Sequence, residues 1–146
     1  MVVVRPAVFD NGQVTGGQVY GWRDADRQVD IAEICCGLGT WSWVARGSGL
    51  SVGAAIDSDS WCCDRVAALG LPVWKGHVET EEARGRLCQV APTMVVGSPP
   101  CLPSSGAGQQ CGGSDDRSQT MLWSLVAAMS CGAHCVAREL VAETGR

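Results

Sequence analysis

The chain has 146 residues, of which 46% are hydrophobic and 18% charged, and its formal net charge is −4. This length suits a single domain with a substantial core, and this composition excludes a mostly disordered chain. No apolar stretch approaches the ~20 residues of a membrane span, and residues 1–6 are too short and too soon broken by proline for a signal peptide. The acidic net charge differs from that of proteins that hold nucleic acid through a basic patch of their own.

The predicted elements alternate between strands and helices from Val29 onward. Residues 1–28 are polar and glycine-rich, with a hairpin turn expected at Asn11-Gly12. We expect Thr40 and Ser60 to cap the first two helices, and Gly47 and Gly70 to follow their ends. The expected elements in chain order are strand 31–35, helix 40–46, strand 51–56, helix 61–69, strand 71–74, helix 80–89, strand 93–96, helix 121–129 and strand 135–137. This alternation is typical of a parallel sheet in an α/β fold.

The first strand leads into Cys36-Gly37-Leu38-Gly39, and Asp57 lies twenty residues after Gly37. Glycines at this position let the backbone approach a ligand, and an acid at the end of the second strand can accept hydrogen bonds from ribose hydroxyls. Nicotinamide enzymes and adenosylmethionine enzymes both use this arrangement. Ser42 replaces the third glycine of the dinucleotide fingerprint, which favours the methyl donor over a nicotinamide. The alternative is a tight turn with a solvated Asp57.

The fourth strand runs directly into Gly97-Ser98-Pro99-Pro100-Cys101. Two prolines stiffen the backbone, and ligands bind at the carboxyl ends of strands in open α/β sheets. A thiol at this position is placed like a nucleophile, although a buried cysteine beside a proline-rich turn is the ordinary alternative.

These segments together resemble the cytosine-5 DNA methyltransferase family over roughly residues 30–142. The likeness rests on the Pro-Pro-Cys core, the glycine loop and Asp57. It also rests on Asp116-Arg117, in which Arg117 lies sixteen residues after Cys101, and on Glu139, twenty-two residues after Arg117. The resemblance implies a doubly wound, mostly parallel, Rossmann-like sheet of order 3-2-1-4-5 that is incomplete at its C-terminal end. It also implies methyl transfer from S-adenosyl-L-methionine to C5 of a cytosine that is flipped out of DNA.

The resemblance further implies a role for individual residues. Cys101 would be the nucleophile that adds to C6 of cytosine, and Glu139 would contact N3. Ser105 and Arg117 would contact the substrate. The residues implied for the methyl donor are Cys35, Gly37, Leu38, Gly39, Trp41, Asp57, His77, Val78 and Pro99.

The chain departs from the family pattern at several positions. His77 replaces an acid that contacts the adenine amino group, Leu102 and Ser104 replace a glutamine and a phenylalanine, and Leu140 replaces an asparagine. The later arginine-bearing motif and target-recognition domain have no counterpart here. These departures keep open a methyltransferase for tRNA cytosine, a non-catalytic binding module of the same fold and, less favoured, a nicotinamide-binding domain.

The remaining predictions concern organisation and surroundings. We expect residues 1–28 to be a polar N-terminal extension and residues 29–146 a partial catalytic domain without target-recognition domain, for which a second chain that completes the domain is a candidate partner. Nine cysteines without CxxC spacing indicate reduced thiols in an intracellular protein, nuclear in a eukaryote or cytoplasmic in a bacterium. We expect Cys131, His134 and Cys135 to pack in the core rather than bind metal. Five tryptophans are expected to be core or helix-packing residues and not base-stacking platforms: Trp22, Trp43, Trp61, Trp74 and Trp123.

Overall fold

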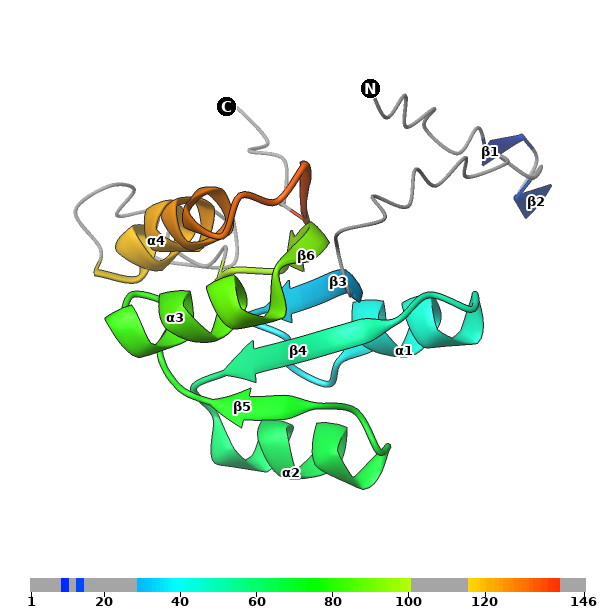
Figure 1. The fold of residues 1–146 in the computed structure, drawn as a ribbon. Helices are drawn as coiled ribbons and strands as arrows, with labels where there is room; N and C mark the ends of the chain where they lie inside the picture. The colour runs from blue at the N-terminus through cyan, green and yellow to red at the C-terminus, as the bar shows by residue number, and fades with distance from the viewer. Residues whose placement is uncertain (1–8, 11–12, 15–28, 101–115, 140–146) are drawn as a thin grey trace, which may run out of the picture.

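The computed structural model describes residues 9–10, 13–14, 29–100 and 116–139, with the backbone alone described in 9–10, 13–14 and 116–118 (Figure 1). The elements in chain order are β1 Phe9–Asp10, β2 Gln13–Val14, β3 Val29–Ile34, α1 Thr40–Gly47, β4 Val52–Asp57, α2 Ser60–Ala68, β5 Val73–Lys75, α3 Glu81–Val90, β6 Pro92–Gly97, α4 Asp116–Ser130 and β7 Cys135–Arg138.

The main sheet has five strands in the order β5-β4-β3-β6-β7, and every neighbouring pair is parallel. The predicted order 3-2-1-4-5 and the predicted doubly wound α/β class are therefore confirmed. The order reverses between β3 and β6, where the chain leaves one half of the sheet and starts the other. A reversal of this kind opens a crevice at the carboxyl ends of the strands, where ligands of such folds bind.

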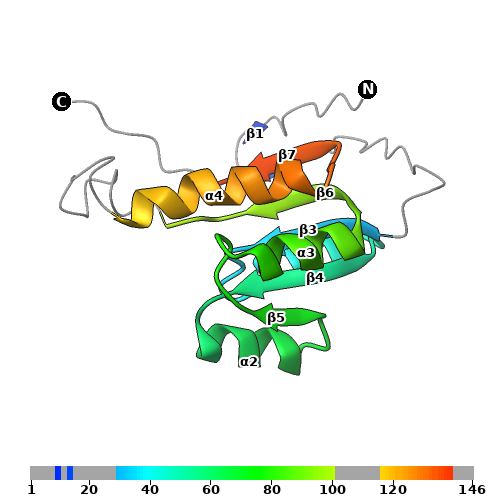
Figure 2. The same cartoon turned by 60° about the vertical axis from the view of Figure 1, so that its left-hand side comes forward.

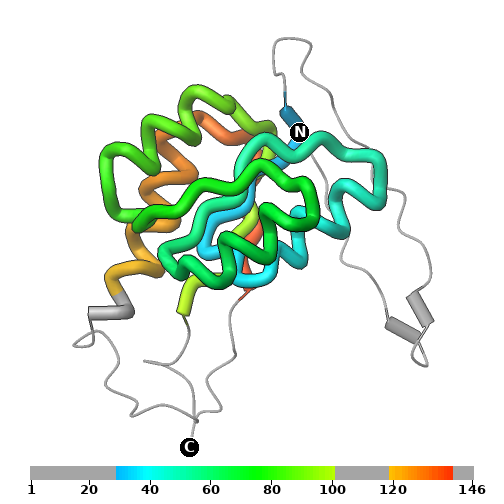
Figure 3. The backbone as a smooth tube through the Cα atoms, turned by 90° about the horizontal axis from the view of Figure 1, so that it is seen from below, coloured from blue at the N-terminus to red at the C-terminus, as the bar shows by residue number. Residues whose placement is uncertain are grey.

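Helices cover both faces of this sheet, α1 and α2 on one side and α3 and α4 on the other (Figures 2 and 3). Alternation along β4 explains the two layers: Ala54 and Ile56 belong to the apolar cluster under α3 and α4, whereas Ala55 packs with Val66 of α2. Ile31 of β3 packs with Ala45 of α1 in a third, smaller cluster. Successive residues of a strand point to opposite faces, so a sheet covered on both sides reads as a continuous apolar run.

The short β1 and β2 pair antiparallel, with Phe9 opposite Val14 and Asp10 opposite Gln13. This pairing is the one expected of a hairpin around Asn11-Gly12, although those two turn residues lie outside the described part of the chain.

The helix ends differ from the prediction in three places, the first of which is Gly47: it is the last residue of α1, and Ser48 is the C-cap. Gly39, with φ of 72°, is the N-cap of α1, and Thr40 is already the first helical residue. Asp59, not Ser60, caps α2, because its Oδ1 accepts a hydrogen bond from the backbone N–H of Cys62 at 2.9 Å. A carboxylate is as good an N-cap as a hydroxyl, and two adjacent candidates cannot be told apart by residue type alone.

Two tryptophans predicted to pack in the core lie at the surface: Trp43 is 61% exposed and Trp61 is 60% exposed. The period of α1 explains Trp43, since Ser42 and Ala45 face the sheet and leave Trp43 on the opposite side. Small residues at the two inward positions let the helix approach the strands closely. Trp74 and Trp123 are partly buried against the main cluster, as predicted.

Within the described ranges, no helix combines the length and the apolar character that crossing a bilayer requires.

Candidate functional site

A pocket of about 500 Å³ opens at the carboxyl edge of the sheet. Its walls come from the segments that follow β3, β4, β5 and β6 and from the first turns of α4, so it lies where the strand order reverses. Pockets that bind small molecules commonly have volumes of about 300 to 1,000 Å³. The residues that line it are Cys35, Gly37, Ile56, Asp57, Ser58, Gly76, His77, Val78, Glu79, Ser98, Pro100 and Thr120.

The loop after β3 is a tight turn in which three residues adopt positive φ: Cys35 at 51°, Gly37 at 51° and Gly39 at 72°. The backbone N–H of Gly39 donates to the carbonyl of Cys36 at 2.7 Å and closes the turn. At Gly39, an added Cβ would lie 3.0 Å from a methyl group of Val66, so the loop packs tightly on α2. Glycine is needed here for both its conformation and its size.

A buried carboxylate that the sequence analysis did not single out holds this loop in place. Glu33 of β3 is 1% exposed, and its two oxygens accept the backbone N–H groups of Trp41 at 3.3 Å and Ser42 at 2.8 Å. These donors belong to the first turn of α1, whose free N–H groups carry a partial positive charge. Burial raises the pKa of Glu33 even though these hydrogen bonds favour the ionised form. An acid between the buried apolar residues Ala32 and Ile34 was the available signal.

Asp57 joins the ends of β3 and β4 at the pocket wall. Its Oδ2 accepts the backbone N–H of Gly37 at 2.7 Å, and its Oδ1 accepts that of Asp59 at 2.9 Å. A carboxylate has about four acceptor positions, so these two bonds leave room for hydroxyl donors from a ligand. The predicted ribose contact therefore has both a place in the pocket and free acceptor capacity.

The segment after β5 brings a second acid into the pocket. His77 Nδ1 lies 3.5 Å from Glu79 Oε1, and both side chains line the cavity. Val78 between them is 4% exposed and anchors the segment in the core. The acid that the family pattern places at His77 is absent from that position, but Glu79 supplies a carboxylate to the same pocket two residues later, and the sequence analysis missed it.

The two thiols at the start of the loop are unreactive by environment. Burial, followed by the negative charges of Asp57 and Glu79, raises the pKa of Cys35 to about 12. Burial likewise raises the pKa of Cys36, which is 6% exposed. Both remain protonated at neutral pH, so Cys35 contributes an uncharged, polarisable wall to the pocket and not a nucleophile.

Three polar side chains form a chain of hydrogen bonds across the carboxyl edge. Trp41 Nε1 donates to Ser98 Oγ at 3.3 Å, and Ser98 Oγ donates to Glu139 Oε2 at 3.3 Å. The backbone N–H of Glu139 also donates to the carbonyl of Gly97 at 3.1 Å. Glu139, at the end of β7, is thus held beside Ser98, which begins the proline-rich segment and lines the pocket.

The predicted donor residues divide into two groups. Cys35, Gly37, Asp57, His77 and Val78 line the pocket, whereas Leu38, Gly39, Trp41 and Pro99 do not. Leu38 is 54% exposed and Trp41 is 41% exposed, because both stand on the outer side of the loop and of α1.

Next to the buried Pro99, it is Pro100 that reaches the cavity. The next residue in the sequence, Cys101, lies outside the described residues, as do Ser105 and the side chain of Arg117.

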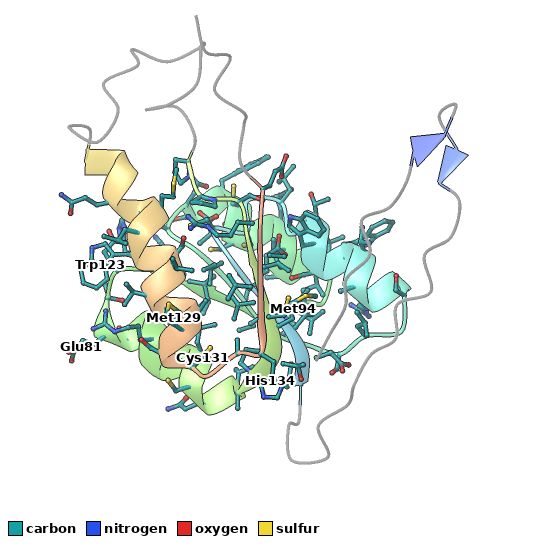
Figure 4. All side chains as sticks on the ribbon, turned by 90° about the horizontal axis from the view of Figure 1, so that it is seen from above. Glu81, Met94, Trp123, Met129, Cys131 and His134 are labelled. Carbon is teal, nitrogen blue, oxygen red and sulfur yellow. The ribbon has the colours of Figure 1, made fainter. Side chains whose placement is uncertain are left out.

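The remaining cysteine and histidine cluster lies at the other end of the sheet. Cys131 and His134 occupy the turn between α4 and β7 (Figure 4), and the backbone N–H of His134 donates to the carbonyl of Thr93 at the start of β6. Among the residues in 29–100 and 116–139, no group of three or more His, Cys, Asp or Glu side chains is arranged to hold a metal ion.

The pocket as a whole fits a nucleoside-bearing ligand such as the methyl donor. It combines carboxylates with open acceptor positions, exposed backbone at Gly37 and Gly76, and apolar walls from Ile56 and Val78. At Gly76 an added Cβ would lie 2.1 Å from the ring of Trp74, so this wall tolerates no side chain.

Comparison with known proteins identifies the same family that the sequence resembles. A profile of the C-5 cytosine-specific DNA methylases matches residues 29–130. No curated protein matches the sequence.

Several solved structures are similar in fold. A DNMT2 variant from Spodoptera frugiperda has 18% identity and a TM-score of 0.57, covering 78% of this chain and 36% of that chain. The Dnmt2 methyltransferase of S. pombe has 16% identity and a TM-score of 0.56, covering 77% and 34%. A protein assigned as a DNA modification methyltransferase of an E. coli prophage has 17% identity and a TM-score of 0.63, covering 82% and 34%. The chain thus spans about a third of the length of these structures.

Proposed function

The chain belongs to the C-5 cytosine-specific DNA methylase family, and from this we propose that it acts in methyl transfer from S-adenosyl-L-methionine to C5 of cytosine in DNA. In this proposal residues 29–146 are part of a catalytic domain and residues 1–28 an extension of it. The family profile covers residues 29–130, which are most of the proposed catalytic segment 29–146.

One observation carries the proposal: the pocket and Glu139 share the carboxyl edge, and Ser98 touches both. Ser98 lines the cavity and donates to Glu139 Oε2 at 3.3 Å. Pro100, also in the cavity wall, directly precedes Cys101 in the sequence. Glu139 thus contacts the segment that precedes Cys101 in the sequence, which supports a reaction in which the acid and the thiol act on one base beside a bound donor.

The donor end of the pocket would hold the nucleoside. Asp57 would accept hydrogen bonds from ribose hydroxyls, and Glu79 or His77 would contact the adenine amino group. When bound, S-adenosyl-L-methionine supplies an electrophilic methyl group on a sulfonium. The apolar wall of Ile56 and Val78 would exclude water from this end.

The base end would use Cys101 and Glu139. Cytosine C5 is a poor nucleophile, and addition of the Cys101 thiolate at C6 turns the ring into an enamine in which C5 can attack the methyl carbon, with cleavage of the sulfur–methyl bond and S-adenosylhomocysteine as the leaving group. Glu139 would hydrogen-bond at N3 and stabilise the charge that this addition brings. Loss of the C5 proton and cleavage of the Sγ–C6 bond then regenerate the thiolate and release 5-methylcytosine.

Two partners belong to the proposal. The target cytosine would have to leave the duplex to reach the pocket edge, as bases do in enzymes that modify them. A second polypeptide that contributes nucleic-acid-binding surface is the other, because the net charge of −4 is unfavourable for holding a phosphate backbone unaided.

The test is to trap a covalent adduct. The chain is incubated with methyl-labelled donor and with a DNA duplex that carries 5-fluorocytosine, because fluorine at C5 blocks the final elimination. We expect a labelled protein–DNA adduct that Cys101→Ser abolishes and Glu139→Gln strongly reduces. Cys88→Ser, an exposed thiol of α3 that does not line the pocket, is the matched control and should behave like the wild type.

Other outcomes separate the alternatives. An adduct with the equivalent RNA but not with DNA would replace the DNA substrate by tRNA-like RNA. Binding of S-adenosylhomocysteine with no adduct on either nucleic acid would favour a binding module. Tight binding of NADH with no binding of S-adenosylhomocysteine would contradict the methyltransferase proposal.

A further inference from the structure

Arg138, the last residue of β7, places a guanidinium between β7 and α4. Its Nη2 donates to the carbonyl of Met121 in α4 at 2.6 Å. Its Nε is buried and has no hydrogen-bond partner among the described residues. A buried N–H without an acceptor costs free energy, and one on a charged group costs more, so this atom calls for an anionic acceptor.

No described acidic side chain supplies that acceptor. The ion pairs in the described part of the chain join His77 to Glu79 and Arg84 to Glu81, and neither involves Arg138. The neighbouring Glu139 turns to Ser98, as expected of consecutive strand residues that point to opposite faces. The Met121 carbonyl of α4 accepts from the guanidinium, and the Cys35 thiol, in the loop after β3, is within electrostatic reach of it.

This guanidinium lies beside the pocket. Cys35, within electrostatic reach of Arg138, lines the cavity, and Thr120, which precedes Met121, lines it as well. Arg138 is paired with Gly97, the residue before Ser98. The two acids of the pocket, Asp57 and Glu79, follow β4 and β5 on the other side of β3. The pocket therefore has an acidic end and, across β3, a cationic neighbour.

We infer that Arg138 binds the carboxylate of the amino-acid part of the methyl donor and so orients the donor along the pocket. This inference rests on the proposed function. The free Nε and the remaining Nη hydrogens form the fork that a carboxylate fits with two parallel hydrogen bonds. A donor whose ribose lies at Asp57 would extend its amino-acid end toward β6 and β7. Arg138 is thereby a positioning residue for the donor.

A phosphate of the nucleic-acid backbone is the other anion to consider. The Nε atom is covered, the side chain as a whole is half-buried, and Nη2 is held by the Met121 carbonyl of α4. A phosphodiester within a polymer cannot enter such a site without the rest of the strand, whereas the end of a small ligand can. The geometry therefore favours the carboxylate of a bound small molecule.

The experiment compares two probes that differ only in this carboxylate: S-adenosylhomocysteine and decarboxylated S-adenosylhomocysteine. Binding to the full chain is measured by calorimetry. We expect the wild type to prefer S-adenosylhomocysteine by about 10- to 100-fold, the range expected for a hydrogen bond to a charged group. Arg138→Met should bring this preference to within about threefold of unity, and Arg138→Lys should keep part of it.

The matched control is Arg46→Met. Arg46 also donates through Nη1 to backbone carbonyls, those of Leu69 and Gly70, but it does not line or adjoin the pocket. This variant should keep the full preference for the carboxylate. Arg138→Gln, which retains a hydrogen-bond donor for Met121, serves as the second variant if Arg138→Met unfolds in a thermal melt, and it should show the same loss of preference.

Each contrary result overturns the inference in a recognisable way. Equal binding of both probes by the wild type, or an unchanged preference in Arg138→Met and Arg138→Gln, removes the carboxylate contact while donor binding stands. An equal loss for both probes would reduce Arg138 to a structural residue. Weaker DNA binding with an unchanged preference would assign the guanidinium to a phosphate. Absence of binding of either probe to the wild type would refute the donor site of the proposed function together with the inference.

Discussion

The two halves of the carboxyl edge use polar side chains differently. Glu33 of β3 and Asp57 of β4 each accept two backbone N–H groups, and these bonds tie the first turn of α1 and the segments after β3 and β4 to the sheet. After β6 and β7, Ser98 and Glu139 meet in a single contact of 3.3 Å, and Arg138 keeps a buried N–H without a partner. The first half is a frame that local hydrogen bonds complete, whereas the second half retains hydrogen-bonding capacity for other molecules.

This difference predicts where substitutions affect stability and where they affect ligands. In the first half the side chains replace the backbone partners that a helix start and a tight turn lack. In the second half Ser98 and Glu139 contribute little to folding, because their contact is exposed and solvent can replace it. The predictions below follow this contrast from the largest expected effect on stability to the smallest.

Glu33→Ala should cause the largest loss, about 2 to 4 kcal/mol in the free energy of unfolding. The change leaves two N–H groups of α1 without acceptors and opens a cavity at a fully buried position. Urea unfolding followed by circular dichroism measures the effect. Glu33→Gln is the control and should lose less, because the amide keeps one acceptor oxygen. A loss below about 0.5 kcal/mol for Glu33→Ala would contradict the structural role of the carboxylate.

Asp57→Ala should cost about 1 to 3 kcal/mol, because Gly37 and Asp59 lose the acceptor of their backbone N–H groups. Asp57→Asn should recover part of this stability, since its amide oxygen can still accept one of the two bonds. Binding of adenosine-containing ligands should weaken in both variants. If calorimetry finds unchanged binding together with the expected loss of stability, Asp57 stabilises the fold but does not contact the ligand.

The pH dependence of stability should differ between the wild type and Glu33→Gln. Because burial raises the pKa of Glu33 in the folded chain, the folded state holds a proton that the unfolded state has already lost above its ordinary pKa of 4.5. The contribution of Glu33 is therefore most favourable below pH 4.5 and declines as the pH rises toward the folded-state value. Urea unfolding of both proteins from about pH 4 to pH 8 should show the wild type losing stability relative to the glutamine variant. A constant difference would refute this.

Ser98→Ala and Glu139→Ala should have the smallest effects on stability, about 0.5 kcal/mol or less each. Their contact is exposed and long, and exposed polar pairs contribute little. A double-mutant cycle that measures a coupling well above this value would show that Glu139 stabilises the fold as Glu33 and Asp57 do, and it would contradict the proposed difference between the two halves.

Much of the fold follows from patterns within short segments. The alternation of apolar strands with capped helices predicted the parallel sheet, the family resemblance predicted its strand order, and the glycines at 37, 39 and 70 marked turns at which the structure has positive φ. The family resemblance then identified the residues of the pocket wall after β3, β4 and β5. Two kinds of prediction were wrong. Ser60 was chosen as the N-cap of α2 in place of the adjacent Asp59, and the exposed Trp43 and Trp61 were expected to be buried.

Two of the residues missed at the site, Glu33 and Arg138, bind groups of a different element, such as the Met121 carbonyl that accepts from Arg138 seventeen residues later. The third, Glu79, contacts His77 two residues earlier in the same segment. Hydrophobic periodicity records which face of an element is buried, but it does not record which neighbour lies opposite.

By itself, the amino-acid sequence determined the order of strands and helices, the turns between them and the family to which the chain belongs, because these depend on local conformational preferences and short motifs. Only the tertiary structure decided that the buried Glu33 accepts the first N–H groups of α1 and that Glu79 lines the pocket beside His77. It also decided that Arg138 lies next to the same pocket with a buried Nε–H that has no partner among the described residues. Hydrogen bonds act over about 3 Å, so their partners depend on how the elements pack.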